Sequence, residues 1–375
     1  MSAAATLLMI GVGMIVPLLP QRIHAETGSL HSVGLVASVF AVAYLLAQLP
    51  AGMLADRLGA KPMLVAGYGL CAVSGVGFFM ADRATGILAG RAVQGLGEAP
   101  IWALGPALLS IAYPAARGRA IGIYNAAIHL GLMTGPMLGL LLVDTGRSQT
   151  PFLVFATVCL LGAVAIASLL PRIPATADGT HAAKPSMRAV LGLFLHGPSR
   201  ILLTGIGLYG ACYGVFISVL PITMATMKGA GSREIAYLFV VFYAGVGLSQ
   251  LVAGPLSDRY GRTGFMTGGL ILAIIGLSAL LSLPASFAYP ALALASLGLG
   301  VFCVASLARL NDVTPHHLKG TVSGTYYFAW AIGYVLGPMM IGLVEPMAAG
   351  LGYGLLTIAL AAQALMLATR RAGGR

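Results

Sequence analysis

Long apolar runs separated by short polar stretches make up nearly the whole chain. A helix that crosses the hydrocarbon core of a bilayer needs about 20 predominantly apolar residues. Twelve stretches reach that length, and the sequence predicts helices over 2–20, 33–53, 62–80, 86–110, 118–142, 151–170, 200–221, 234–256, 264–283, 287–309, 320–343 and 350–369. We therefore expect an all-α membrane protein with twelve transmembrane helices.

One long polar connection interrupts this pattern. It covers residues 171–199 and holds Pro171, Pro174, Asp178 and Lys184. The sequence thus predicts an N-terminal six-helix bundle over 1–170, a cytoplasmic linker over 171–199 and a C-terminal six-helix bundle over 200–375.

The two predicted bundles repeat the same motifs. Four residues of the loop after the second span recur 202 positions later: Gly52, Asp56, Arg57 and Gly59 as Gly254, Asp258, Arg259 and Gly261. The fifth span recurs in the eleventh with the same offset: Gly122, Tyr124, Gly131, Gly135 and Pro136 as Gly324, Tyr326, Gly333, Gly337 and Pro338. One offset for two separate motifs indicates two superposable halves, an architecture in which a binding site forms between the repeats near the bilayer midplane.

Composition and charge agree with a membrane protein. Of the 375 residues 58% are apolar and 8% are charged, whereas a soluble domain has about 25% charged residues. The net charge of +11 does not indicate nucleic-acid binding, because the basic residues stand singly or in pairs between apolar runs. With the N-terminus inside, fifteen Lys and Arg residues fall on the cytoplasmic side and five on the outer side, which predicts that both termini are cytoplasmic.

The cysteines and the N-terminus add two expectations. Cys71, Cys159, Cys212 and Cys303 all fall within apolar runs without a CxxC pair, so neither a disulfide framework nor a zinc site is expected. The first apolar run begins next to Met1 without a basic region before it. We interpret it as the first span rather than as a cleaved signal peptide.

The duplicated loop is a candidate gating latch. In the first copy Asp56 and Arg57 lie where a helix leaves the membrane, so the carboxylate can cap a neighbouring helix and the arginine can form an ion pair. Gly52 and Gly59 permit a tight turn and close packing. A solvated loop is the alternative interpretation, but recurrence in the second half favours the latch. Its charged members, with those that follow each loop, are Asp56, Arg57, Lys61, Asp258, Arg259 and Arg262.

Small residues define one face of the fifth span. Gly131, Gly135 and Gly139 are spaced four apart, so they share a face that lets another helix approach closely, and Pro136 can bend the span. The pattern predicts a packing seam. We add the hypothesis that Gly131, Gly135 and Pro136 help to set which conformation seals the outer side.

The fourth span concentrates the polar chemistry. Arg91 and Glu98 are seven residues apart, hence about 20° apart on the helical wheel and roughly 10 Å along the axis. Gln94 and Trp102 fall on the same side. A carboxylate within hydrocarbon must be protonated, paired or exposed to a water-filled cavity. Glu98, with Arg91, is therefore the candidate proton-coupling site; the alternative is a structural ion pair between the two.

Two polar residues of the fifth span lie one turn apart, away from its glycines. His129 is a candidate proton relay near neutral pH, although an intramembrane histidine is more often a hydrogen-bonded packing residue. We list Asn125, together with Gln94 and Trp102 of the fourth span, as candidate substrate-binding residues.

Aromatic residues gather in the second half. Several lie mid-span, where an interfacial belt of aromatic residues is not expected. An aromatic-lined pocket suits a flat or amphipathic substrate through stacking and cation–π contacts; ordinary packing is the alternative. The candidates for this pocket are Tyr209, Tyr213, Tyr243, Gln250, Tyr326, Tyr327, Trp330 and Tyr334.

These motifs resemble the major facilitator superfamily over the whole chain. The stretch GMLADRLGAK from Gly52 resembles the superfamily's signature after the second span, with Ala60 where a basic residue is usual, and Arg91, Gln94 and Gly95 match its RxxQG pattern. The glycines and proline of the fifth span resemble an exporter signature. The first span, Ile10 to Pro20, resembles that of twelve-span drug:proton antiporters. The resemblance implies two pseudo-symmetric six-helix bundles.

The fourth span departs from the drug antiporters. Its stretch from Gly95 to Pro100 is similar to spinster-like lipid transporters and organic-anion transporters, in which such a glutamate and the preceding arginine take part in coupling. The first span also lacks an acidic residue, so the resemblance implies Glu98 rather than a residue of that span.

We therefore expect a secondary active transporter, a multi-pass protein of the cell inner membrane that exports small organic or amphipathic compounds by alternating access. The proton gradient would supply the energy, without a cofactor. A proton-coupled organic-anion symporter and a lysolipid or sphingoid exporter of spinster type stay open as alternatives. We expect a small-molecule substrate and membrane lipids as partners, no nucleic acid, a monomer, no metal site and no enzymatic activity.

Overall fold

The computed structural model describes residues 1–112, 117–144, 149–171, 192–195, 197–313, 322–344 and 350–372. Most of the predicted linker over 171–199 therefore lies outside the described residues. The backbone of Asp56, Arg57 and Asp258 is helical, but their side chains are outside the described part, and so are the surroundings of Gly52.

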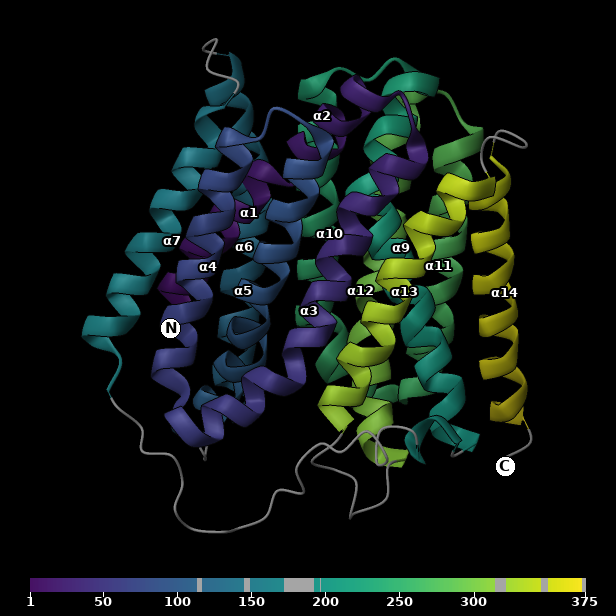
Figure 1. The fold of residues 1–375 in the computed structure, drawn as a ribbon. Coiled ribbons are helices and arrows are strands. Elements are labelled where there is room, and N and C mark those ends of the chain that lie inside the picture. Colours follow the sequence, from purple (N-terminus) through teal and green to yellow (C-terminus); the bar gives the residue numbers. More distant parts are fainter. Residues whose placement is uncertain are drawn as a thin grey trace. The chain divides into compact units, whose positions relative to one another are not determined.

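In the described residues the regular secondary structure consists of helices, without strands (Figure 1). The first part of the chain forms α1 (Ser2–Ile15), α2 (Leu18–Thr27), α3 (Leu30–Leu58), α4 (Ala60–Met80), α5 (Ala84–Ala112), α6 (Arg117–Asp144) and α7 (Thr150–Leu169). The second part forms α9 (Gly197–Lys228), α10 (Ser232–Tyr260), α11 (Arg262–Ser282), η1 (Ala285–Phe287), α12 (Ala288–Val313), α13 (Val322–Val344) and α14 (Leu351–Ala372). Each predicted span thus has a helical counterpart.

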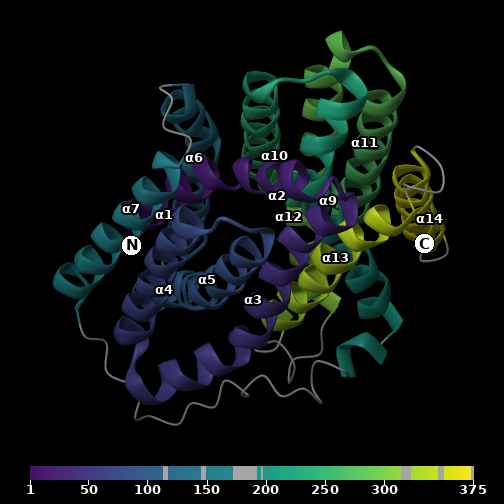
Figure 2. The same cartoon turned by 45° about the horizontal axis from the view of Figure 1, so that its top comes forward.

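The first predicted span, over 2–20, differs from the structure. Helix α1 ends at Ile15 and α2 continues to Thr27 as a separate segment (Figure 2). Pro17 lacks a backbone N–H and so interrupts the helical hydrogen bonds, although Val16 and Pro17 both keep right-handed helical dihedrals. Gly28, in the left-handed conformation with φ of 63°, then ends α2.

Three other spans extend beyond their predicted ends because prolines near those ends do not stop them. Pro50, Pro221 and Pro255 all lie inside helices, in α3, α9 and α10 respectively. In a membrane, neighbouring helices and local adjustments satisfy the carbonyl that a proline leaves unpaired. Helix α9 consequently reaches Lys228 rather than residue 221.

Length and surface character fit a bilayer. Within the described residues, eleven helices are long and apolar enough to cross a membrane. Helix α5 has the length of a span as well, at 29 residues, and carries the polar residues of the predicted coupling site. Large apolar side chains are exposed, for example Leu169 at 81% and Ile358 at 66%, as expected of surfaces that contact lipid.

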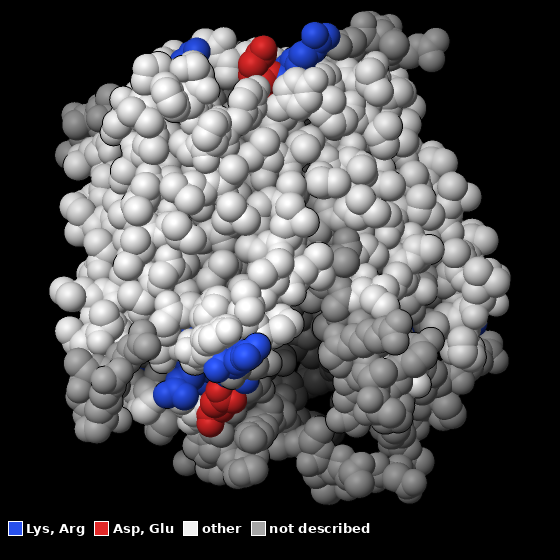
Figure 3. Space-filling view, turned by 180° about the vertical axis from the view of Figure 1, so that it is seen from behind, with Lys and Arg blue, Asp and Glu red and all other residues white. Residues whose placement is uncertain are grey.

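Charged side chains are sparse on the surface. On the face drawn in Figure 3, the conspicuous Lys, Arg, Asp and Glu side chains gather at its upper edge and in its lower left part, and most of the area between these two groups is uncharged. This distribution suits a protein whose middle band lies in hydrocarbon, where an unpaired charge is costly.

The chain packs as two compact units. One combines Met1–Gly179 with Ile217–Val240, and the other combines Thr180–Phe216 with Val241–Arg375. In the first unit α1 packs against α6 and α7, α3 and α4 pack against α5, and α4 packs against α7; in the second, α11 packs against α12 and α14. The division into bundles over 1–170 and 200–375 follows the duplicated motifs and stays a prediction.

Candidate functional site

The polar residues of α5 form a continuous hydrogen-bonded ladder. The Arg91 guanidinium donates from Nη1 to Gln94 Oε1 at 2.9 Å, and Gln94 Nε2 donates to Glu98 Oε1, also at 2.9 Å. The Trp102 indole Nε1 donates to Glu98 Oε2 at 3.1 Å. These residues follow one another at intervals of three or four, the spacing that places side chains on one face of a helix. The structure thus brings together the four residues predicted for the fourth span.

Helix α3 holds the arginine end of this ladder. Arg91 Nε donates to the Val36 carbonyl oxygen at 2.9 Å, and the guanidinium carbon lies 4.3 Å from the centre of the Phe40 ring. A cation over an aromatic face is attracted to it, the more so when water is excluded. Arg91 is 2% exposed, so its charge is satisfied by protein groups inside the bundle.

Glu98 is buried with both carboxylate oxygens engaged. It is 3% exposed, and Gln94 beside it is 0% exposed. Gln94 stands between Arg91 and Glu98 in the ladder, so its amide links the guanidinium to the carboxylate. Gln94 is therefore inaccessible to a solute in this structure, whereas Trp102 is partly exposed.

The candidate relay on α6 is bonded to its own helix. His129 Nδ1 lies 2.9 Å from the Asn125 carbonyl oxygen, one turn earlier, and both side chains are partly exposed. Another residue of α6 contacts α5 directly: the Tyr124 hydroxyl lies 3.5 Å from the Ile101 carbonyl oxygen.

The predicted glycine seam packs α6 against α1. A Cβ atom at Gly131 would meet the Thr6 carbonyl oxygen, and one at Gly135 would meet the Ile10 carbonyl oxygen and the backbone of Gly13. The packing prediction is confirmed, while the role of this seam in sealing the outer side stays a prediction. Gly139 lies against the Met14 backbone in the same way.

Tyr213 is the centre of an aromatic cluster in the second unit. Its ring centre lies within 6.4 Å of the centres of five other rings: Tyr209, Phe242, Tyr243, Trp330 and Tyr334. Phe242 also stacks on Phe216 with 3.6 Å between centres. Helices α9, α10 and α13 each contribute to it, so residues predicted from three spans lie in one place.

The remaining candidates of the second unit meet at a cysteine. Cys303 Sγ lies 3.2 Å from the Tyr326 hydroxyl and accepts from Gln250 Nε2 at 3.6 Å. Tyr327 packs edge-on to Tyr326, with 5.5 Å between ring centres. The aromatic candidates thus divide into the Tyr213 cluster and this smaller group around a thiol.

The duplicated loop is a tight turn in both copies. Gly59 ends α3 and begins α4 with φ of 87°, and Gly261 does the same between α10 and α11 with φ of 96°. Both glycines adopt a positive φ, a backbone conformation that is unfavourable for residues with a Cβ atom. Each donates its N–H to the residue four positions back, Ala55 and Ser257 respectively. The predicted turn is confirmed.

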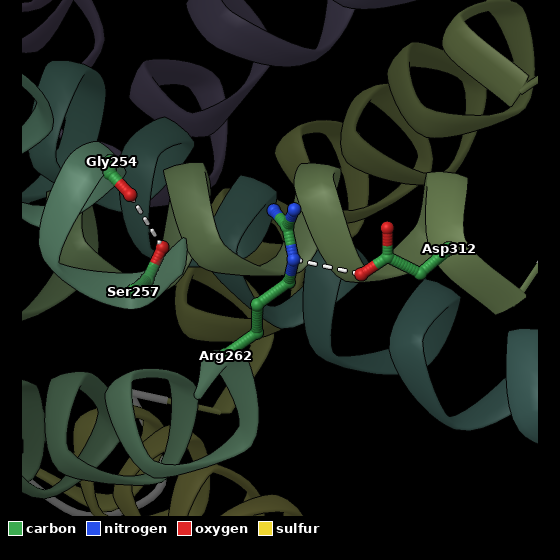
Figure 4. Close-up of polar contacts among 4 residues, drawn as sticks. All are labelled: Gly254, Ser257, Arg262 and Asp312. Atoms are coloured by element: carbon green, nitrogen blue, oxygen red, sulfur yellow. Dashed lines mark hydrogen bonds and ion pairs between the residues drawn. The ribbon is translucent and has the colours of Figure 1, made fainter. Parts of the chain in front are cut away.

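Basic residues after these turns bind different partners. Arg262 Nε and Asp312 Oδ2, at 2.7 Å, join the start of α11 to the end of α12 (Figure 4). Figure 4 also shows Ser257 donating to the Gly254 carbonyl oxygen, within the motif that leads to the turn. Arg259 lies over the Tyr260 ring. In the first unit Lys61 Nζ donates to the Leu170 carbonyl oxygen at the end of α7, at 2.7 Å.

Several residues of these sites were not among the sequence candidates: Phe40, Phe216, Phe242 and Cys303. The repeat offers a signal for two of them, because Phe40 and Phe242 are 202 positions apart and each lies in a polar or aromatic cluster of its unit. Phe216 and Cys303 sit in uninterrupted apolar runs and give no such signal.

Comparison with known proteins identifies the family. Residues 1–338 and 202–373 match the Major Facilitator Superfamily. The vesicular acetylcholine transporter of Rattus norvegicus is 28% identical over 326 residues, which are 83% of this chain and 60% of that protein. This chain thus spans less than two thirds of that relative's length.

Two solved structures share the fold. The human organic anion transporter MFSD10 (TETRAN) superposes with a TM-score of 0.74 at 19% identity, covering 98% of this chain and 97% of that one. A bacterial homologue of the human lysosomal transporter Spinster, in an inward-facing and unoccupied conformation, gives 0.76 at 18% identity, with 98% and 93% coverage. The chain belongs to the Major Facilitator Superfamily and has the all-α, multi-pass membrane fold of that family.

Proposed function

We propose that this protein is a transporter that exports small organic or amphipathic compounds across the cell inner membrane in exchange for protons, by alternating access. The observation that carries the proposal is Glu98, a carboxylate buried within a span and held by two hydrogen-bond donors. A buried carboxyl group that changes its protonation state when alternating access exposes it to water on one side or the other is what proton coupling requires. Arg91 and Gln94 would influence whether Glu98 is protonated or ionised.

The aromatic cluster around Tyr213 is the proposed substrate surface. Tyr213 and Trp330 are partly exposed, so they could offer stacking faces and, for a positively charged compound, cation–π attraction, while the buried rings of Tyr209, Phe242, Tyr243 and Tyr334 pack around them. The name of one relative, the vesicular acetylcholine transporter, favours a small organic cation as the first compound to test. We keep His129 as a proposed relay and Asn125 and Trp102 as proposed substrate contacts.

Two alternatives use the same residues differently. In an organic-anion symporter Arg91 would bind a substrate carboxylate; in a spinster-type exporter a lysolipid or sphingoid would enter from the bilayer. The names of the structures that share the fold include an organic anion transporter and a Spinster homologue, so both deserve a test. Arg91 already contacts Val36, Phe40 and Gln94, which favours a structural use of its charge over anion binding.

The decisive experiment reconstitutes Glu98→Gln in proteoliposomes and measures transport driven by a pH gradient. We expect at least a tenfold loss of gradient-driven transport, with counterflow of substrate retained, because an amide cannot carry a proton between the two sides. Glu26→Gln, at an exposed acid of α2, is the matched control and should transport normally. Unchanged gradient-driven transport in Glu98→Gln would show that Glu98 is not the coupling site.

The direction in which substrate moves relative to the proton gradient distinguishes the proposal from its two alternatives. Labelled organic cations, organic acids and lysolipids are offered in turn to vesicles of known orientation, with the gradient in each direction. Exchange of a cation for protons supports the proposal, whereas movement of an acid together with protons, or of lysolipid alone, supports one of the alternatives.

A further inference from the structure

Gln94 occupies a position in which only one orientation of its amide fits while Glu98 is ionised. On one side is the Arg91 guanidinium, which has donors and no acceptor; on the other is Glu98, which when ionised has acceptors and no donor. The amide accordingly turns Oε1 to the arginine and Nε2 to the carboxylate. The reversed amide would place its NH2 against the guanidinium and its oxygen against the carboxylate oxygen, so both contacts would be lost.

Both oxygens of Glu98 accept hydrogen bonds from the groups that face them. Oε1 accepts from the Gln94 amide and Oε2 accepts from the Trp102 indole, and an indole has no acceptor for a hydroxyl proton. The ladder is therefore built around an ionised carboxylate. A proton added to either oxygen converts an acceptor into a hydroxyl that needs an acceptor of its own.

We propose that Gln94 is a positioning residue that couples the protonation of Glu98 to the hydrogen bond between Gln94 and Arg91. When water delivers a proton to Oε1, the new O–H bond can be satisfied by the Gln94 carbonyl oxygen only if the amide turns over. The turned amide presents its NH2 to the guanidinium, and the hydrogen bond between Arg91 and Gln94 breaks. Loss of the proton to water reverses each step. This inference rests on the proposed role of Glu98 in proton coupling.

Arg91 has other contacts when Gln94 releases it. Its Nε contact with the Val36 carbonyl oxygen and the Phe40 ring both belong to α3. Protonation of a residue on α5 would thus shift the balance of contacts between α5 and α3, which pack against each other. Two discrete amide orientations provide the bistable element that such a switch requires.

The titratable and charged groups around Glu98 come from four helices, since Cys159 of α7 interacts with Tyr68 and Cys71. Arg91 lies on its own helix; Tyr68 and Cys71 of α4 and Tyr124 of α6 are close enough to interact electrostatically, directly or through one another. Phenols and thiols in water titrate at about pH 10 and 8.5. Of these groups Glu98 is the one expected to change charge as a proton gradient is applied.

Trp102 supplies an optical probe of this ladder. The chain has two tryptophans, so Trp330→Phe leaves Trp102 as the sole indole, in contact with Glu98 Oε2. The emission of purified protein in lipid nanodiscs is recorded against pH. We expect one transition in this background and its disappearance in Glu98→Gln, because the indole then faces a group of fixed charge.

A double-mutant cycle then tests Gln94. Arg91→Met should move the midpoint of the Trp102 transition by at least about half a pH unit, a threefold change, when Gln94 is present. In a Gln94→Met background the same substitution should move the midpoint by less than half as much, because the amide no longer links the two groups. Arg91→Lys, which keeps the charge without the planar fork, replaces Arg91→Met if the latter does not fold.

The control is Gln363→Leu. Gln363 is another fully buried glutamine, whose amide donates to the Ile201 carbonyl oxygen in the second unit, and its loss should leave the midpoint unchanged. An equal effect of Arg91→Met with and without Gln94 would overturn the inference, since the arginine would then act through space. The proposed function fails separately, if Glu98→Gln retains gradient-driven transport.

Discussion

Helices α5 and α12 cross their neighbours in the same way but carry different side chains. A Cβ atom at Gly97 of α5 would meet the Gly67 carbonyl oxygen of α4; one at Gly298 of α12 would meet the Gly269 carbonyl oxygen of α11. Gly67 and Gly269 are 202 residues apart, and Gly97 and Gly298 are 201 apart. The two pairs are therefore equivalent crossings of the duplicated fold.

The residues beside the crossing differ completely. Taking the offset of 201 along α12, Arg91, Gln94, Glu98 and Trp102 correspond to Leu292, Ala295, Leu299 and Cys303. The first unit thus has a charged ladder where the second has apolar residues and a thiol. Conversely, the aromatic cluster around Tyr213 belongs to the second unit. Duplication preserved the close backbone contacts, while the chemistry of the two halves diverged.

The largest effect on the yield of folded protein is expected from placing a large side chain at either of the two close helix crossings. Gly97→Leu and Gly298→Leu should each abolish most of the folded protein, because overpacking a close contact typically costs about 1–3 kcal/mol and here the obstacle is backbone. Size-exclusion yield and melting temperature measure it. Gly69→Leu and Gly268→Leu, at positions where a Cβ meets nothing within 4 Å, are the matched controls. Tolerance of one crossing substitution and not the other would disprove their equivalence.

Exchanging Glu98 and Leu299, which follow the crossing glycines Gly97 and Gly298, tests whether the two halves differ in chemistry. The double variant Glu98→Leu with Leu299→Glu keeps the composition but places the carboxylate in a position without the ladder. We expect pH-gradient-driven transport to fall at least tenfold and its pH dependence to vanish, because the carboxylate is then separated from the Gln94 and Trp102 donors of α5. Transport in proteoliposomes over a range of pH measures it, and recovery of the pH profile would show that the ladder is dispensable.

Removing the central ring of the aromatic cluster should have an intermediate effect. Tyr213→Ala takes away a partly exposed ring, and because one stacking contact contributes about 0.5–1.5 kcal/mol, we expect roughly a tenfold weaker apparent affinity for an organic cation. Tyr213→Phe keeps the ring and serves as control. Substrate-dependent thermal shift gives the affinity, and an unchanged value for Tyr213→Ala would place the substrate elsewhere.

The smallest effect concerns the ion pair after the second turn. Arg262 and Asp312 are 25% and 42% exposed, and exposed pairs contribute about 0–1 kcal/mol. Arg262→Ala and Asp312→Ala should each change the melting temperature little, and a double-mutant cycle should give a coupling under about 1 kcal/mol. Lys61→Ala is the first-half counterpart. If the coupling energy between Arg262 and Asp312 were several times larger, this ion pair would dominate the stability of its unit, unlike the contact of Lys61 with the Leu170 carbonyl oxygen.

Much of the architecture followed from the sequence. Apolar runs of membrane-spanning length gave the helices, and the repeated Gly59 and Gly261 gave the tight turns, because only glycine enters the positive φ region without strain. The spacing of Gly131 and Gly135 gave the seam with α1. The break between α1 and α2 was missed, since other prolines, such as Pro50 and Pro221, lie inside continuous helices.

The sequence by itself determined the helices, the duplication, the family resemblance and the set of polar residues on one face of α5, because helical periodicity fixes which side chains share a face. Only the tertiary structure decided how those residues bond. It placed Gln94 between Arg91 and Glu98, gave Arg91 the carbonyl of Val36 and the ring of Phe40, and gathered Tyr213 with rings from α10 and α13. These contacts join different helices or depend on side-chain rotamers, and neither is encoded in the spacing along one helix.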